Sequence, residues 1–139
     1  MAFSKQTAPS IDEVRPYLHG VAKHLVDRIW GPRGPAWGTK LTEMEDLLVA
    51  IQETLAERML QHALQRQAAD PAAERPPEYQ LCPGCHGVTD VDDPEPRLVQ
   101  TRAGEAEWQE PPEFCRRCRR AFSLSPRCLW LKARACRRA

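Results

Sequence analysis

The sequence has no cysteine before position 82 and no long apolar run, since the longest run spans only Leu47 to Ile51. Its first residues also lack the basic start, apolar core and small-residue cleavage site of a secretory signal. The short runs exclude a membrane-spanning helix, and the missing signal argues against a disulfide-linked secreted scaffold. We therefore expect a cytoplasmic protein that keeps its thiols reduced and does not bind a membrane.

Room for a large hydrophobic core is also lacking. The 139 residues allow one ordinary domain or two small ones, and the 13 prolines and 7 glycines fall mostly between segments. A unit of about 40 to 60 residues buries too little apolar surface to be stable without a disulfide, a metal or a partner. The sequence predicts small domains of α+β class, each of which needs such support.

Negative charge is absent from the end of the chain. Residues 114–139 carry nine basic and no acidic side chains, whereas residues 71–113 carry three basic and ten acidic ones. Residues 1–70 are nearly balanced, with eight basic and nine acidic side chains. The net charge of +1 therefore hides an acidic middle next to a basic end, and the basic end favours an anionic partner.

Two amphipathic helices are predicted in the first half of the chain. Ser10 and Glu13 form a capping-box pattern, and apolar residues follow at helical spacing as far as position 30. Thr42 and Glu45 form a second such pattern before a helix expected over residues 42–67. A stretch rich in glycine and proline excludes regular structure between the two helices.

Together the helices, over about 11–30 and 42–67, predict a helical hairpin within residues 1–69. Their apolar stripes can cover each other only in part. A homodimer through this hairpin would cover the rest. The bounds expected for the rest of the chain are an extended proline-rich linker over 70–80, a β-module over 81–124 and a disordered basic tail over 125–139.

The β-module begins after the first cysteine pair. The segments 97–101 and 105–108 flank a turn that contains Gly104, which is the pattern of a β-hairpin. Phe114 and residues 121–124 bracket the second cysteine pair and predict a third short strand. This order of knuckle, hairpin, knuckle and strand is that of a zinc ribbon.

The cysteine spacing predicts one structural zinc ion. Cys82 and Cys85 form one C-x-x-C pair, Cys115 and Cys118 form another, and 29 residues separate the two pairs. Each pair presents two sulfurs on one side of a tight turn, so that two turns complete the tetrahedral four-thiolate shell that Zn²⁺ prefers. A closed shell leaves no position for water, and the metal is therefore expected to hold the fold rather than to catalyse.

The sequence gives less support to other roles for the cysteines and for His86. A thioredoxin-like role for Cys82 and Cys85 would need the pair at the start of a helix, which the following glycine, threonine, aspartate and proline do not predict. His86 could replace one thiolate, but it more simply occupies a left-handed knuckle position. Disulfides remain an alternative, and Cys128 and Cys136 are expected to be free thiols because no knuckle sequence surrounds them.

Basic residues surround the second knuckle and continue beyond it. A four-thiolate zinc centre carries a formal charge of −2, so some of these cations simply offset the metal site. The block extends further than that need, which favours phosphate contacts, with a solvated disordered tail as the alternative. The candidate nucleic-acid-binding residues are Arg116, Arg117, Arg119, Arg120, Arg127, Lys132, Arg134, Arg137 and Arg138.

Three motifs in this chain resemble a known family. They are Cys82-Pro83-x-Cys85, Arg97-x-Val99-x-Thr101-x-x-Gly104-Glu105-x-Glu107-Trp108, and Cys115-x-x-Cys118-x-x-Ala121-Phe122. The pattern is similar to the zinc-ribbon front end of ISKra4-type insertion-sequence transposases, in which a helical segment precedes the ribbon. The stretch Gly38-Thr39-Lys40-Leu41-x-x-Met44-Glu45 also fits that front end, and the resemblance covers residues from about 15 to 122.

The chain departs from the family at two places. His86 stands where glycine is usual, and Ser123-Leu124-Ser125-Pro126 replaces the step into the RNase H-like catalytic domain. In that family the acidic catalytic residues lie far downstream, so none can be assigned here. The resemblance implies a truncated, non-catalytic fragment with DNA-binding capacity, and residues 123–139 are expected to be the end of an interrupted reading frame rather than a selected basic tail.

The alternative function is a zinc-stabilised protein-interaction or dimerisation module that does not contact nucleic acid. For either function we expect no enzymatic activity and no small-molecule substrate, since the sequence contains no convincing nucleophile, base or open metal site.

Overall fold

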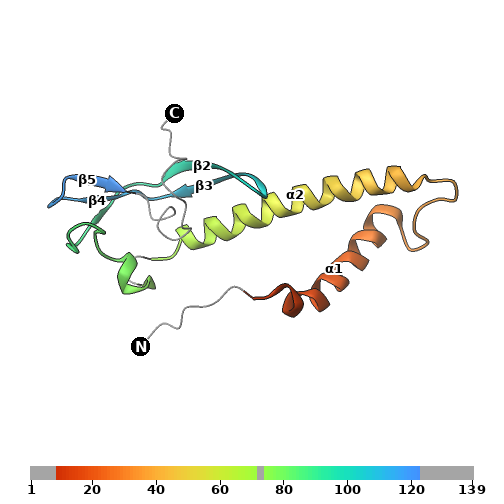
Figure 1. The fold of residues 1–139 in the computed structure, drawn as a ribbon, viewed down its shortest axis with the longest axis horizontal. Coiled ribbons are helices and arrows are strands. Elements are labelled where there is room, and N and C mark those ends of the chain that lie inside the picture. Colours follow the sequence, from red (N-terminus) through yellow and green to blue (C-terminus); the bar gives the residue numbers. More distant parts are fainter. Residues whose placement is uncertain (1–8, 72–73, 123–139) are drawn as a thin grey trace. The chain divides into compact units, whose positions relative to one another are not determined.

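The structure, a computed structural model, describes residues 9–71 and 74–122 (Figure 1). Two helices and two small antiparallel sheets make up the described residues, which agrees with the expected α+β class. The chain divides into two compact units, Met1–Val49 and Ala50–Ala139. Among the described residues no helix combines the length and the apolar character needed to cross a membrane.

Helix α1, Ile11–Trp30, begins at the predicted capping box. The Glu13 N–H donates to Ser10 Oγ over 3.3 Å, and the Ser10 N–H donates to Glu13 Oε2 over 2.9 Å. Two orphan donors of the first turn are thereby satisfied. The helix ends at Gly31, whose φ of 79° lies in the left-handed region that glycine adopts without strain.

Helix α2, Leu41–Ala68, starts differently from the prediction. The expected capping box of Thr42 and Glu45 is wrong, because the helix already begins before Thr42. The Lys40 N–H instead donates to Glu43 Oε2 over 3.3 Å, which is half of a capping box without an N-cap hydroxyl. Thr39, the nearest preceding hydroxyl, donates to the Ala36 carbonyl over 2.8 Å and ends the loop rather than capping the helix.

No residue from 9 to 49 is buried, although α1 is clearly amphipathic. On α1, Ile11 is 62% exposed, and on α2, Leu41 is 65% exposed. Burial of apolar surface is the dominant favourable contribution to folding. The first unit therefore has no hydrophobic core of its own within these residues.

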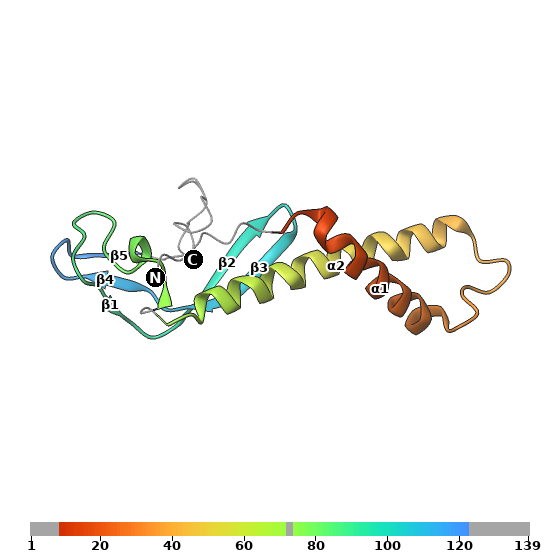
Figure 2. The ribbon, with the colours of Figure 1, turned by 90° about the horizontal axis from the view of Figure 1, so that it is seen from below.

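The core of the second unit lies between α2 and a β-hairpin. Strands β2 (Glu95–Thr101) and β3 (Gly104–Glu110) are antiparallel over their full lengths, with Thr101 opposite Gly104 at the turn. The C-terminal part of α2 runs beside this hairpin in both views (Figures 1 and 2). The buried cluster consists of Leu64, Ala106 and Trp108, with Leu60, Ala68 and Val99 packed against it.

Polar contacts fix the register of helix against hairpin. Gln65 makes two bonds with Gln109, because its side-chain oxygen accepts from the Gln109 N–H over 2.9 Å and its amide nitrogen donates to the Gln109 carbonyl over 3.3 Å. At the turn, Gly104 has a φ of 112°, and a Cβ there would lie 3.0 Å from Glu57 Oε2. The turn can approach α2 this closely only because the residue is glycine.

A separate three-stranded sheet carries the second cysteine pair. Its strands are β1 (Asp90–Val91), β4 (Glu113–Cys115) and β5 (Arg120–Phe122), in the order β1-β4-β5. The expected third strand is therefore present as β5, but it pairs with β4 and not with the hairpin. The predicted hairpin itself is confirmed by the register of β2 and β3.

The segment after α2 is not a simple extended linker. Pro77–Tyr79 form a 3₁₀ turn, and Arg75 is only 9% exposed. Arg75 donates through Nε to the Asp70 carbonyl over 3.3 Å, and its own carbonyl accepts a bond from the Gln80 side chain. Residues 70–80 were expected to be an extended linker, but the described part of this segment is held in place by these bonds.

Candidate metal centre

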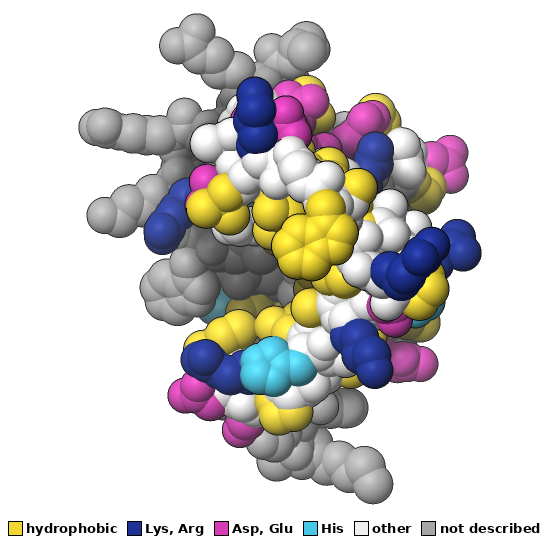
Figure 3. Space-filling model, turned by 90° about the vertical axis from the view of Figure 1, so that its right-hand side faces the viewer, with side chains coloured by type: hydrophobic (Ala, Val, Ile, Leu, Met, Phe, Trp, Pro, Cys, Tyr) yellow, Lys and Arg dark blue, Asp and Glu magenta, His cyan; other side chains and the backbone are white. Residues whose placement is uncertain are grey.

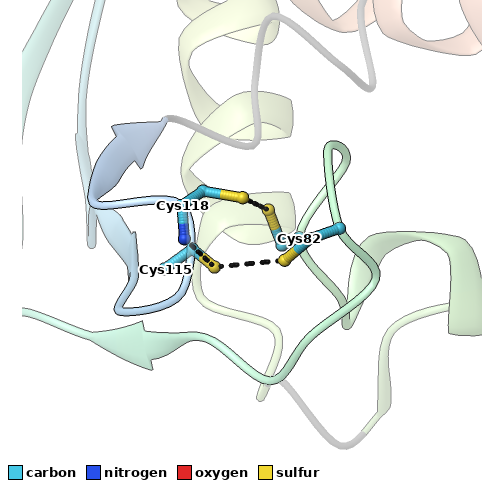
Figure 4. Close-up of side chains that lie close together, drawn as sticks. Cys82, Cys115 and Cys118 are labelled. Carbon is cyan, nitrogen blue, oxygen red and sulfur yellow. Dashed lines mark hydrogen bonds between the residues drawn. The ribbon is translucent and has the colours of Figure 1, made fainter.

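Four cysteine sulfurs converge at one point. Cys82 Sγ lies 3.9 Å from Cys118 Sγ, Cys85 Sγ lies 3.5 Å from Cys115 Sγ, and all four sulfurs lie within 4.8 Å of one another. Figure 4 shows Cys82, Cys115 and Cys118 pointing toward one another. A tetrahedral ion with Zn–S bonds of about 2.3 Å holds its sulfurs about 3.8 Å apart. The four cysteines can therefore hold one metal ion.

The two C-x-x-C turns are alike. In the first, the Gly84 N–H donates to Cys82 Sγ over 3.4 Å, and in the second, the Cys118 N–H donates to Cys115 Sγ over 3.5 Å. The residue after each pair has a left-handed backbone, with φ of 56° at His86 and 53° at Arg119. The two knuckles thus share their spacing and the left-handed residue after the second cysteine, and in each a backbone N–H donates to the first cysteine's sulfur.

The first knuckle closes as a very small hairpin. The Cys82 N–H donates to the Gly87 carbonyl over 2.9 Å, and the His86 N–H donates to the Cys82 carbonyl over 2.9 Å. A bridge between Leu81 and Val88 completes it. A Cβ at Gly87 would lie 3.3 Å from Cys85 Sγ, so the small residue leaves room for that sulfur.

The local backbone favours ionisation at one sulfur. Backbone N–H donors, first Gly84 and then Cys85, lower the pKa of the Cys82 thiol to about 6. A hydrogen bond with Cys85 and desolvation raise the pKa of the Cys118 thiol to about 12. Without a cation, the thiolate of Cys82 forms readily while Cys118 keeps its proton. A metal ion among the sulfurs would stabilise all four thiolates.

A buried ion pair lies next to the four clustered cysteines. Glu113, two residues before Cys115, is 1% exposed, and its Oε1 accepts a bond from Arg75 Nη1 over 2.5 Å. Its Oε2 accepts a bond from Thr89 Oγ1 over 2.8 Å. This network joins the segment after α2, the strand that carries Cys115 and the chain leaving the first knuckle. The sequence did not predict this ion pair, because one glutamate among many acidic residues carries no pattern that indicates burial.

The other predicted site residues fall into three groups. His86 is exposed and does not belong to the sulfur cluster. Arg116, Arg117, Arg119 and Arg120 are exposed around the second knuckle, and Arg116 Nε contacts Asp90 Oδ2 at 2.5 Å. The rest lie outside the described residues, namely Arg127, Cys128, Lys132, Arg134, Cys136, Arg137 and Arg138.

Comparison of the chain with family models, with curated proteins and with solved structures found no match.

Proposed function

We propose that the four cysteines hold one structural Zn²⁺ ion and that the chain is a non-catalytic zinc-ribbon protein. The convergence of four sulfurs within 4.8 Å from two equivalent knuckles carries the proposal. Four thiolates fill a tetrahedral shell, and zinc is the ion that this soft donor set suits best in proteins. A filled shell has no position for a substrate or a water molecule, so the metal would act as a cross-link between β4 and the first knuckle.

We further propose that the second knuckle contacts DNA phosphates. Arg117, Arg119 and Arg120 are exposed, and among the described residues none of the three takes part in a salt bridge. Arg116 is less available to a phosphate, because it forms a salt bridge with Asp90. Part of this charge would offset the zinc centre, and the remainder would be available to an anionic backbone. The basic residues from Arg127 onward belong to the same proposal on their charge alone.

The resemblance of the three motifs to the front end of ISKra4-type transposases fits this function, since that segment belongs to a protein that works on DNA. We propose a relation to that front end on the motifs alone. Within the 139 residues no side chain can be assigned to the family's catalytic acidic residues, so the relation bears on DNA contact alone.

Metal analysis tests the zinc site. Protein purified under reducing conditions should contain one zinc ion per chain, and Cys115→Ser should lose it. Cys128→Ser is the matched control, because Cys128 lies outside the knuckles and its loss should leave the metal in place. Metal-free wild-type protein, or zinc retained by Cys115→Ser, would contradict the assignment.

Salt-dependent retention on duplex DNA tests the second part. If the basic end engages about five phosphates, log affinity should fall with log salt at a slope of about −4.5. Replacing Arg116, Arg117, Arg119 and Arg120 by Gln should flatten that slope without releasing zinc. Binding that is absent at low salt, or that does not respond to salt, would count against DNA as the partner.

A second candidate is dimerisation through the first unit. The observation that favours it is the absence of any buried residue from 9 to 49 beside an amphipathic α1. Leu18→Glu together with Leu25→Glu should then lower self-association in sedimentation equilibrium, whereas Lys23→Glu, on the opposite face of α1, should not. A wild-type protein that stays monomeric at all concentrations would exclude this candidate.

A further inference from the structure

The loop between α1 and α2 presents a fully exposed tryptophan. Trp37 has a relative exposure of 105%, so nothing in the described chain covers either face of its indole ring. Its neighbours in sequence are Ala36 and Gly38, and nothing lies within 4 Å of a Cβ built at Gly38. Tryptophan is rarely left uncovered, because its ring is the largest apolar side chain available to a core.

The loop around Trp37 has a fixed conformation. The Gly34 N–H donates to the Gly31 carbonyl over 3.1 Å, and the Thr39 N–H donates to the Ala36 carbonyl over 3.1 Å. Prolines at positions 32 and 35 restrict the chain further. These turns and prolines restrict the backbone on both sides of the indole, which lowers the entropy lost when a partner binds.

Residues 28–42, which include this loop, carry only positive charge, and the nearest acidic side chain in the following helix, Glu43, accepts a bond from the Lys40 N–H. Arg28, Arg33 and Lys40 are exposed, and no acidic residue lies between Asp27 and Glu43. Among the described residues, neither Arg33 nor Lys40 takes part in a salt bridge. Figure 3 shows a face of the molecule on which dark-blue basic side chains lie beside yellow hydrophobic ones, with magenta acidic side chains among them.

From these observations we propose that Trp37, with Arg33 and Lys40, is a binding site for single-stranded nucleic acid. A base stacks on the exposed indole, and the two cations neutralise the phosphates on either side of it. This pairing of an aromatic platform with flanking positive charge is how sequence-independent single-strand sites work. In a duplex the bases are already stacked on one another, so the platform selects unpaired strands. The site lies in the first unit and does not rest on the proposed DNA contact of the second knuckle.

Fluorescence anisotropy with labelled oligothymidylate on the zinc-loaded full chain tests the proposal. Trp37→Ala should weaken binding roughly five- to 150-fold, the range for loss of one stacked base. Trp37→Phe should lose less, because it keeps an aromatic face. The matched control is Tyr17→Ala, which removes an aromatic residue that is 72% exposed but lies outside the basic loop, and it should bind as the wild type does.

Charge and strand type give further readouts. Arg33→Gln with Lys40→Gln should flatten the salt slope by about 1.4, or about 0.7 for each single-strand phosphate released. The Trp37→Ala loss should persist in the variant with four knuckle arginines replaced by Gln, which separates this site from the proposed function. An equal loss with oligouridylate identifies the base ring as the bound group, and a loss confined to one polymer shows that its sugar or the thymine methyl group also contributes.

Two results would overturn the proposal. One is an unchanged oligothymidylate affinity in Trp37→Ala, with helix content by circular dichroism equal to that of the wild type. The other is a Trp37→Ala variant that loses self-association but keeps its nucleic-acid affinity, which would make the loop a docking site for a protein chain.

Discussion

Removing Arg75 should weaken zinc binding, even though Arg75 is not a metal ligand. In Arg75→Met the Glu113 carboxylate stays buried at 1% exposure and keeps only the bond from Thr89. Breaking a buried ion pair by deleting one partner costs about 3–5 kcal/mol, because the remaining charge is left without compensation. Methionine fills a volume similar to that of arginine, so the loss of zinc affinity measures the missing charge more than the changed packing.

The cost should appear in the metal affinity because metal binding and folding are coupled in small metal sites. If the sheet with β4 folds only with zinc, destabilising the folded form by 3–5 kcal/mol lowers the apparent zinc affinity by roughly two to four orders of magnitude. Competition with a chromophoric chelator measures that affinity directly. Glu113→Leu combined with Arg75→Met should recover much of it, since an apolar pair leaves no buried charge.

Arg116→Met is the matched control for this prediction. Arg116 also pairs with a carboxylate at 2.5 Å, but its side chain is 83% exposed and that of Asp90 is 47% exposed. Exposed pairs contribute about 0–1 kcal/mol, so zinc affinity should change by less than roughly tenfold. Equal zinc affinities for Arg75→Met and the wild type would refute the coupling between the ion pair and the metal site.

Three further predictions concern stability. Chelation of zinc should remove hydrogen-exchange protection from β1, β4 and β5 while the part of α2 that packs on the hairpin keeps its protection, and protection that survives in β4 would show that the sheet folds without metal. Gly104→Ala should lower the free energy of unfolding by about 1–3 kcal/mol in urea titrations, because φ is 112° and Glu57 must move, whereas Gly20→Ala, with open space around it, should raise it by about 0.5–1 kcal/mol. Trp108→Ala should cost about 3–5 kcal/mol by the same assay, and a loss below about 1 kcal/mol would mean that the helix–hairpin core contributes little.

Features that depend on neighbouring residues were predictable from the sequence. The capping box of Ser10 and Glu13 was predicted and is present, because its partners are three residues apart. The hairpin followed from a glycine at a turn between two segments of strand-forming residues, and the register places Thr101 opposite Gly104. Sulfur convergence was also predictable, since paired cysteines at this spacing have few other structural uses.

Features that depend on residues far apart in the sequence could not be predicted from it. Arg75 and Glu113 are 38 positions apart, and no local pattern connects them. The strand that joins β4 on its other side, β1, was also not predicted, because it has two residues and no strand-forming run to indicate it. The bounds of α2, expected at about 42–67, are right to within one residue at each end, but its cap was missed for a different reason. Several polar residues near position 41 can cap a helix, and the outcome depends on Thr39 bonding to Ala36 instead.

A metal ion held by the four cysteines would make up for a small core in the second unit. Its fully buried apolar cluster is limited to Leu64, Ala106 and Trp108 among the described residues. Burying one large apolar side chain contributes about 1.5–3 kcal/mol, whereas ordering one residue of backbone costs about 1–2 kcal/mol. This cluster lies between α2 and the β2–β3 hairpin. In the three-stranded sheet that contains β4, the buried residues are polar or cysteine. Under the proposed zinc site, cross-linking by the metal would therefore be the main stabilising interaction of that sheet, since zinc in comparable sites contributes an apparent ~10–16 kcal/mol. Any function of the exposed arginines around the second knuckle should accordingly require the four cysteines to be reduced and loaded with metal.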